Sequence, residues 1–217
     1  MKKKKIKIGI AITLLLILLS SSVFAYTFTR TRPTTKNFNY YTYALSVAER
    51  SAADNARLTW NSVTNGIAFT RIGGITENDR DFDFEDSYSD VAVLNFSELS
   101  FVYFIPTSAA GYCWTDQNNN YNKFDIILNS TKNWDCGDDQ SFLDRQGVFT
   151  HEFGHAAGLG HNSTIPGGGS PGNTSPSYYQ TMYPDVYDVL GNNLTYCWRT
   201  LESDDINGVK ASASRIE

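Results

Sequence analysis

The sequence predicts an α+β fold, and three observations indicate this class. Apolar residues recur at helical spacing over residues 44–60, short β-rich runs follow between residues 66 and 128, and a second helical pattern covers residues 141–159. A last helix is expected from about Ser203 to Ser212. This order of elements is typical of one sheet that packs against helices, in a single domain over residues 42–217.

The N-terminus has the features of a signal peptide. Lysines at positions 2–5 and 7 precede a nearly unbroken apolar run from Ile8 to Leu19, and Val23-Phe24-Ala25 provides a cleavage sequence. The run is shorter than the roughly 20 residues that a membrane-spanning helix needs. We expect residues 1–25 to be removed and the protein to be secreted, with no stable membrane insertion afterwards. An uncleaved N-terminal anchor is the alternative.

The chain without this segment is strongly acidic. Removal of residues 1–25 takes away five lysines, which leaves 13 Lys and Arg against 23 Asp and Glu, a net charge of −10. Nucleic acid is disfavoured as a partner, because no basic surface is available for phosphates. We expect a monomer.

The first helix follows a polar segment. Residues 26–41 are polar, aromatic and irregular, and indicate an extended arm or a very short pro-segment. From residue 44 to 60, the residues that recur at steps of three and four predict an apolar stripe that packs on a sheet. They are Leu45, Ala48, Ala52, Ala56 and Trp60.

Four runs predict strands. Ile67–Ile72, Val91–Phe96, Phe101–Ile105 and Phe124–Leu128 are short and rich in β-branched and aromatic residues. Turns are expected at Gly73-Gly74 and at residues 118–120.

An acidic run lies between the strands, and it is interpreted either as a solvated loop or as a structural calcium site, because Ca²⁺ binds clustered carboxylate and carbonyl oxygens. The run comprises Asp79, Asp81, Asp83, Glu85, Asp86 and Asp90. Weaker calcium candidates are Asp116 with Asn118–Asn120, and Asp135 with Asp138 and Asp139.

The second helix is expected from Ser141 to Leu159, with Ser141 and Asp144 in a capping-box pattern. The Gly- and Pro-rich stretch at residues 166–172 is expected to be a surface loop. Cys113, Cys136 and Cys197 allow one disulfide and one remaining thiol in an oxidising compartment. Cys113–Cys136 is favoured, and pairings with Cys197 stay open.

All three histidines of the chain lie in His151-Glu152-Phe153-Gly154-His155-Ala156-Ala157-Gly158-Leu159-Gly160-His161. Residues four apart on a helix share one face, so His151 and His155 can bind one ion. Gly158 allows the chain to leave the helix with positive φ, which lets His161 return to the same metal. Three protein ligands leave a position open for water, the pattern of a catalytic zinc site.

Glu152 follows the first histidine and is the expected general base. Zinc lowers the pKa of a bound water, and the carboxylate can accept the proton as water attacks a peptide carbonyl. The same carboxylic acid can then protonate the leaving amine.

The motif resembles the zinc-binding consensus of the metzincin metallopeptidases, H-E-x-x-H-x-x-G-x-x-H followed by a Met-turn. Within that clan the chain is most similar to the matrixins, the matrix metalloproteinase type. Thr181-Met182-Tyr183-Pro184 resembles the matrixin Met-turn, and residues 201–209 resemble the start of the matrixin C-terminal helix. The likeness covers most of residues 40–212.

The resemblance implies a zincin-like fold, with a twisted, mostly parallel sheet, an active-site helix and a C-terminal helix. Met182 would lie beneath the zinc, substrate would add to an edge strand, and Tyr183, Pro184 and Tyr187 would line the specificity pocket. The chain lacks the cysteine switch of animal matrixins, has no spare histidines for their second zinc, and carries one extra residue before Tyr187.

The sequence therefore predicts a secreted zinc-dependent endopeptidase that acts on protein or peptide substrates. Two alternatives are a catalytically weak or inactive zinc-binding adhesion protein, and a protease specific for one partner protein.

Overall fold

The computed structural model describes residues 26–75, 82–116, 120–135, 141–161, 181–182 and 195–216. The expected signal peptide, residues 1–25, lies outside these ranges. The described elements are β1 (Thr27–Phe28), β2 (Asn37–Tyr43), α2 (Val47–Asn61), β3 (Ala68–Ile75), β4 (Asp90–Leu94), α3 (Phe96–Tyr103), β5 (Gly111–Trp114), β6 (Asp125–Asn129), β7 (Trp134–Asp135), β8 (Leu143–Asp144), α4 (Arg145–Ala156), β9 (Leu159–Gly160), the 3₁₀ helix η2 (Thr195–Arg199) and α5 (Ser203–Ser214).

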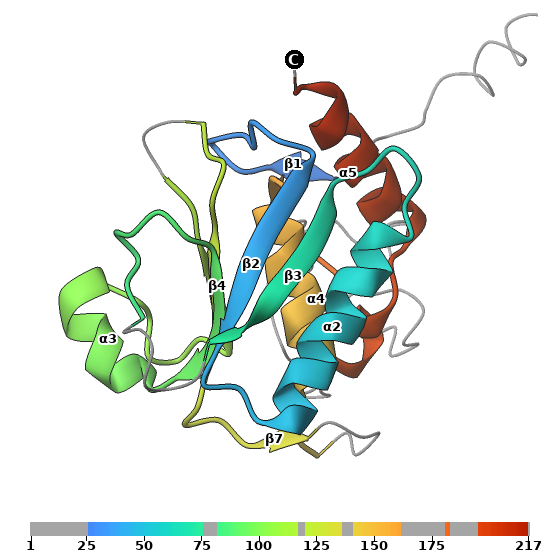
Figure 1. Cartoon of the computed structure of the whole chain (residues 1–217). Coiled ribbons are helices and arrows are strands. Elements are labelled where there is room, and N and C mark those ends of the chain that lie inside the picture. Colours follow the sequence, from blue (N-terminus) through green and yellow to red (C-terminus); the bar gives the residue numbers. More distant parts are fainter. Residues whose placement is uncertain are drawn as a thin grey trace, which may run out of the picture.

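A five-stranded sheet with the order β3-β2-β4-β6-β5 forms the centre of the molecule (Figure 1). The first four strands in this order run parallel, and β5 pairs antiparallel with β6 at one edge. The α+β class and the mostly parallel sheet are thus confirmed. The strand that carries Gly111 to Trp114 was not predicted, because four residues that begin with glycine give a weak strand signal.

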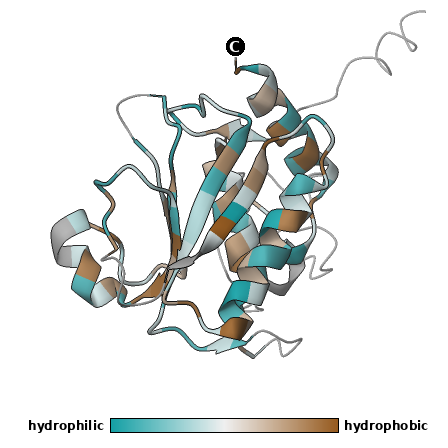
Figure 2. Ribbon diagram, in the orientation of Figure 1, coloured by the Kyte–Doolittle hydropathy of each residue, from teal (hydrophilic) through white to brown (hydrophobic). Residues whose placement is uncertain are grey.

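The main core lies between one face of the sheet and helices α2 and α4. Large aromatic residues fill it, among them Phe38, Phe69, Phe149 and Phe153, each 1% exposed or less. Figure 2 shows the alternation of hydrophobic and hydrophilic residues along the helices that produces this apolar face. The indole nitrogen of Trp60 in α2 donates to the Thr150 carbonyl in α4 at 2.7 Å. The two helices are therefore joined by a buried hydrogen bond as well as by packing.

Helix α2 forms where it was predicted and buries Ala52, Ala56 and Trp60, but Leu45 precedes the helix and Ala48 is exposed. The hydroxyl of Ser46 accepts from the Glu49 backbone amide at 3.3 Å, and the Glu49 carboxylate accepts from the Ser46 amide at 2.8 Å. This reciprocal capping box satisfies two amides that have no partner within the helix. It explains why the helix begins at Val47 rather than at Ala44.

The opposite face of the sheet carries a smaller core, and here one prediction was wrong. Phe101–Ile105 was expected to be a strand, but Phe96–Tyr103 forms α3. Asn95 caps this helix by accepting from the Ser97 amide at 3.0 Å, and Phe104 ends it with a φ of 57°. A short aromatic run fits a strand or a helix equally well, so the cap decides.

The N-terminal segment pairs with two parts of the domain. Strand β1 pairs antiparallel with β9, so that Thr27 faces Gly160 and Phe28 faces Leu159. Strand β2 lies between β3 and β4, and the boundary expected between residues 41 and 42 falls inside it. Residues 26–41 therefore contribute to the sheet and also contact the turn that follows α4.

Helix α4 begins later than predicted. Leu143 and Asp144 form β8, and Asp144 rather than Ser141 is the N-cap. The Asp144 carboxylate accepts from the Gly147 amide at 2.6 Å. A carboxylate caps a helix as well as a hydroxyl does, so the capping-box pattern predicted the helix but not its first residue.

Two further expectations can be compared with the described residues. None of the helices that the structure describes is long and apolar enough to cross a membrane. Cys113 carries a free thiol, while Cys136 and the side chain of Cys197 lie outside the described part. The structure therefore does not contain the favoured Cys113–Cys136 disulfide, and a Cys136–Cys197 pairing stays a prediction.

Candidate metal centre

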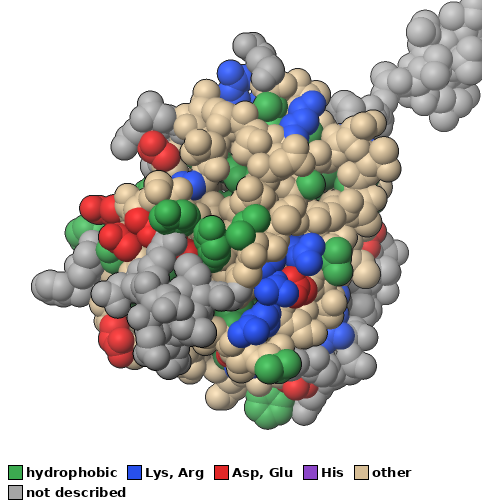
Figure 3. Space-filling view, viewed as in Figure 1, with side chains coloured by type: hydrophobic (Ala, Val, Ile, Leu, Met, Phe, Trp, Pro, Cys, Tyr) green, Lys and Arg blue, Asp and Glu red, His purple; other side chains and the backbone are tan. Residues whose placement is uncertain are grey.

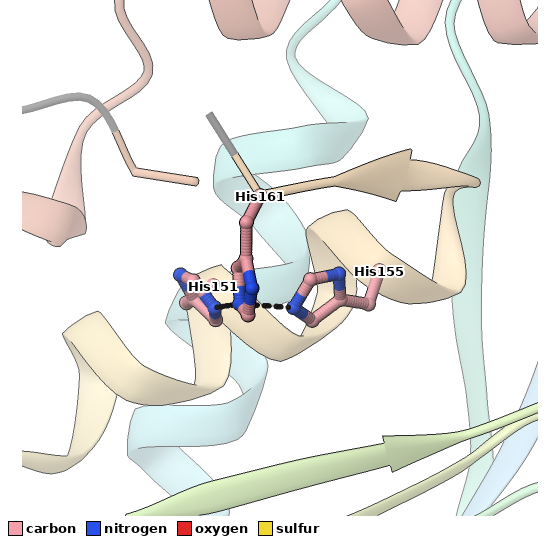
Figure 4. Close-up of side chains that lie close together, drawn as sticks. All are labelled: His151, His155 and His161. Carbon is pink, nitrogen blue, oxygen red and sulfur yellow. Dashed lines mark hydrogen bonds between the residues drawn. The ribbon is translucent and has the colours of Figure 1, made fainter. Parts of the chain in front are cut away.

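The three histidines converge on one point (Figure 4). His151 and His155 extend from α4, and His161 follows β9 and points back at them. The Nε2 atom of His161 lies 3.1 Å from Nε2 of His151 and 3.1 Å from Nε2 of His155. The ligand atoms of the three histidines all lie within 4.8 Å of one another. Among the described residues, this is the group that could hold a metal ion.

Hydrogen bonds to backbone carbonyls fix the tautomers of two rings. Nδ1 of His151 lies 2.6 Å from the Thr181 carbonyl oxygen, and Nδ1 of His155 lies 2.8 Å from the Leu159 carbonyl oxygen. A carbonyl can only accept, so each Nδ1 carries the proton. In a neutral ring the Nε2 lone pair is then free, and both lone pairs face His161. This arrangement suits three nitrogen ligands around one cation.

The spacing fits zinc. Nitrogen ligands at about 2.0–2.1 Å from a tetrahedral ion lie about 3.3 Å from each other, close to the 3.1 Å that separates the imidazole nitrogens here. His151 is buried, His155 is half-buried and His161 is exposed. The centre therefore opens to solvent on the side of His161, which leaves room for a water or a substrate.

Burial keeps His151 and His155 neutral. It lowers the pKa of His151 well below its ordinary value, and the neighbouring histidines lower it further. Burial, then the proximity of His161, lowers the pKa of His155 to about 4. Neutral imidazoles are the form that binds a metal.

The turn after α4 is held by residues from distant parts of the chain. Gly158 has a φ of 88°, as the spacing argument predicted, and a Cβ there would lie 2.8 Å from Ser212 Oγ. The Ser212 hydroxyl donates to the Ala157 carbonyl at 2.6 Å, and the Tyr121 hydroxyl donates to the Ala156 carbonyl at 3.1 Å. These bonds satisfy carbonyls at the end of the helix and direct the chain towards His161.

The indole of Trp198 stacks on the first histidine. The ring centroids of Trp198 and His151 lie 4.7 Å apart with an interplanar angle of 25°, and both side chains are buried. The Thr181 hydrogen bond and this stack constrain the His151 ring from two directions. Nothing in the local sequence around Trp198 indicated this contact, because 47 residues separate the two positions.

Comparisons with known proteins give no assignment. No protein-family model and no curated protein matches the chain. One solved structure, described as "Structure of a chaperone-substrate complex", is similar at 11% sequence identity and a TM-score of 0.36; the similarity covers 88% of this chain and 38% of that chain. A structural similarity this weak supports no inference about the fold or the function of this chain. The site is therefore interpreted from its own geometry.

Glu152 lies next to the histidines and against the edge strand β5. It is 5% exposed, and burial raises the pKa of its carboxyl group to about 8. A Cβ at Gly111 would lie 2.5 Å from Glu152 Oε1 and 2.9 Å from its Cγ. The carboxylate therefore occupies the space above this glycine, and a larger residue at position 111 would displace it.

Met182 packs against the helix between the two histidines that α4 carries. It is 2% exposed, and a Cβ at Gly154 would lie 2.2 Å from its sulfur. The preceding residue, Thr181, provides the carbonyl that binds His151. The segment expected to form a Met-turn thus contacts both α4 and a candidate ligand.

Asp205 of α5 connects the C-terminal helix to this segment. Its Oδ2 accepts from the Thr181 amide at 3.3 Å and from the Glu202 amide at 3.0 Å, and the residue is 1% exposed. Burial raises the pKa of the Asp205 carboxyl to about 6 despite these hydrogen bonds. A chain of contacts therefore leads from α5 through Thr181 to His151.

This raised pKa predicts the pH dependence of stability. Because the folded carboxyl keeps its proton to a higher pH than the unfolded one, the contribution of Asp205 is greatest below pH 4 and is lost as the pH rises to 6. We expect the free energy of unfolding of the wild type, relative to Asp205→Asn, to fall by about 2 kcal/mol between pH 4 and pH 7. Urea unfolding of both proteins between pH 4 and 7 measures it.

Asp204→Asn is the control, since it changes the net charge equally one residue away. A wild type that gains stability relative to Asp205→Asn as the pH rises would contradict the prediction, because it would mean that the fold favours the carboxylate.

Several predicted residues lie outside the described part of the chain. Tyr183, Pro184 and Tyr187, the expected pocket residues, are among them, and so are Asp79 and Asp81 of the acidic run. The pocket and the calcium candidates therefore stay predictions, whereas Met182 and the three histidines are described.

Proposed function

We propose that the protein is a secreted, zinc-dependent endopeptidase with a matrixin-like arrangement of its catalytic centre. The observation that carries the proposal is the convergence of three imidazole nitrogens, with Nε2 of His161 3.1 Å from Nε2 of both His151 and His155. Glu152 is buried on the same helix as His151 and His155. Three protein ligands with an open side are typical of catalytic zinc, whereas structural zinc has four.

His151, His155 and His161 would hold the ion. A bound zinc would act as a Lewis acid towards the scissile carbonyl and would lower the pKa of water at the open position. The hydrogen bonds to the Thr181 and Leu159 carbonyls keep two of the rings in the orientation that binding requires.

Glu152 is proposed as the general base and then the general acid. Its carboxylate would accept a proton from the attacking water and deliver it to the leaving amine. The buried environment that raises its pKa makes it a better base than an exposed glutamate. A nearby cation would favour its ionised form, which is the form that a base needs.

Strand β5 is the proposed site for substrate. It is the antiparallel edge of the sheet, and its Gly111 lies against Glu152. An extended peptide that adds to this edge would bring its backbone close to the proposed base. The pocket for the following side chain is proposed to involve Tyr183, Pro184 and Tyr187.

Metal removal tests the proposal. Purified protein without residues 1–25 should hydrolyse casein, lose this activity in 1,10-phenanthroline, and recover it when zinc is added back. Zinc content is measured in parallel.

Hydrolysis that is insensitive to the chelator would contradict the zinc mechanism. Failure of the zinc-loaded protein to cleave casein and a proteome-derived peptide library would favour the binding or adhesion alternative. Cleavage of a single sequence in the library would favour a protease for one partner protein.

A further inference from the structure

The ammonium group of Lys123 lies in a cage of oxygen atoms at the start of two strands. Its Nζ donates to the backbone carbonyls of Phe84 at 2.9 Å and of Asp86 at 2.6 Å. It also lies 3.3 Å from Oδ2 of Asp125 and 3.5 Å from Oδ1 of Asp86. Two carbonyls and two carboxylates from different segments thus surround one cation.

The cage is largely buried. The Lys123 side chain is 13% exposed and that of Asp125 is 0% exposed. The Trp114 ring covers Nζ from another side, with its centroid 5.2 Å away. Burial of an uncompensated carboxylate or ammonium is strongly unfavourable, so each of the two charges depends on the other.

The cage connects the acidic loop, residues 82–89, to the sheet. Within this loop Asp83 and Asp86 accept from the amides two residues further on, each at 2.8 Å. Oδ1 of Asp125 accepts from the Asp90 amide at 2.9 Å, where β4 and β6 begin. Lys123 therefore holds the fold of the loop against the ends of two central strands.

These oxygen atoms are of the kind that calcium binds. Carbonyls and carboxylates from a loop and a strand end are its usual ligands in proteins. Oδ2 of Asp125 is buried and has no hydrogen-bond donor among the described residues. Burial raises the pKa of the Asp125 carboxyl to about 7, and the ammonium of Lys123, 3.3 Å away, favours the ionised form and offsets part of this effect. Acidic side chains gather on the side of the molecule that carries α3 (Figure 3), where a divalent cation would otherwise be favoured.

We propose that Lys123 is a tethered cation that takes the place of a structural divalent ion, and that the acidic loop is stable without calcium for this reason. Removal of the ammonium converts the cage into a calcium site. The proposal does not depend on the proposed peptidase function, because it concerns stability only.

Thermal melts of the purified protein test it in calcium-depleted buffer and in millimolar calcium. The wild type should melt at the same temperature in both. Lys123→Gln should melt lower in the depleted buffer and rise by about 5 °C in calcium. Lys36→Gln, which removes an exposed lysine, should behave as the wild type does.

A second variant keeps the test decisive. Lys123→Gln combined with Asp125→Asn removes both charges, so its melting temperature should not respond to calcium. If Lys123→Gln folds only in calcium, the proposal is supported. A calcium-dependent wild type would overturn it, and so would a Lys123→Gln protein that calcium does not stabilise or that fails to fold in either buffer.

Discussion

Replacement of Glu152 with glutamine is expected to lower kcat/KM for peptide hydrolysis by about 10³-fold, within the usual range for the loss of a general base. Glutamine has nearly the same shape but cannot accept the proton of the attacking water. Because Glu152 is not one of the three converging ligands, zinc content should not change. Cleavage of a fluorogenic peptide at equal zinc occupancy measures the effect.

Glu98→Gln is the matched control, because it makes the same chemical change in α3, on an exposed residue. It should retain full activity. An active Glu152→Gln protein would mean that another group accepts the proton, and the mechanism would then be wrong even if zinc were essential.

Gly111→Ala is expected to lower kcat/KM by about 10²-fold, since displacement of a catalytic group by about 1 Å can have this effect. The added Cβ would lie 2.5 Å from Glu152 Oε1 and 2.9 Å from Val148 Cγ1. The end of a glutamate side chain moves more easily than backbone does, so the carboxylate should shift while the domain stays folded. Zinc content and melting temperature should change little.

A double-mutant cycle isolates the cause. If Gly111 acts through Glu152, Gly111→Ala should leave the kcat/KM of the Glu152→Gln protein almost unchanged. The losses in kcat/KM of the two single variants should then not add. Additive losses would indicate that position 111 affects activity through substrate binding along β5 instead.

The histidine centre could be predicted from the sequence because its chemistry is local. The spacing of His151 and His155 follows from the helical repeat, and Gly158 marks the exit that brings in His161. The observed φ of 88° at Gly158 confirms the reason for that glycine. Met182 was predicted from the resemblance to the matrixin Met-turn, and it is a buried residue that packs against α4.

The supporting contacts could not be predicted, because they join distant segments. The Trp198 ring stacks on His151, Asp205 binds the Thr181 amide, and Gly111 makes room for Glu152. Each depends on how the sheet and helices pack, and no periodic pattern encodes it. The same limit explains the error at Phe101–Ile105, where a capping residue outweighed strand propensity.

Zinc K-edge X-ray absorption of the purified protein tests the central claim most directly, in combination with the zinc content per chain. The account predicts one zinc per chain, with three imidazole nitrogens and one water oxygen at about 2.0–2.1 Å, and loss of the ion in His161→Ala. A chain that binds no zinc, or that binds it through cysteine sulfur or a fourth protein ligand, would contradict the account.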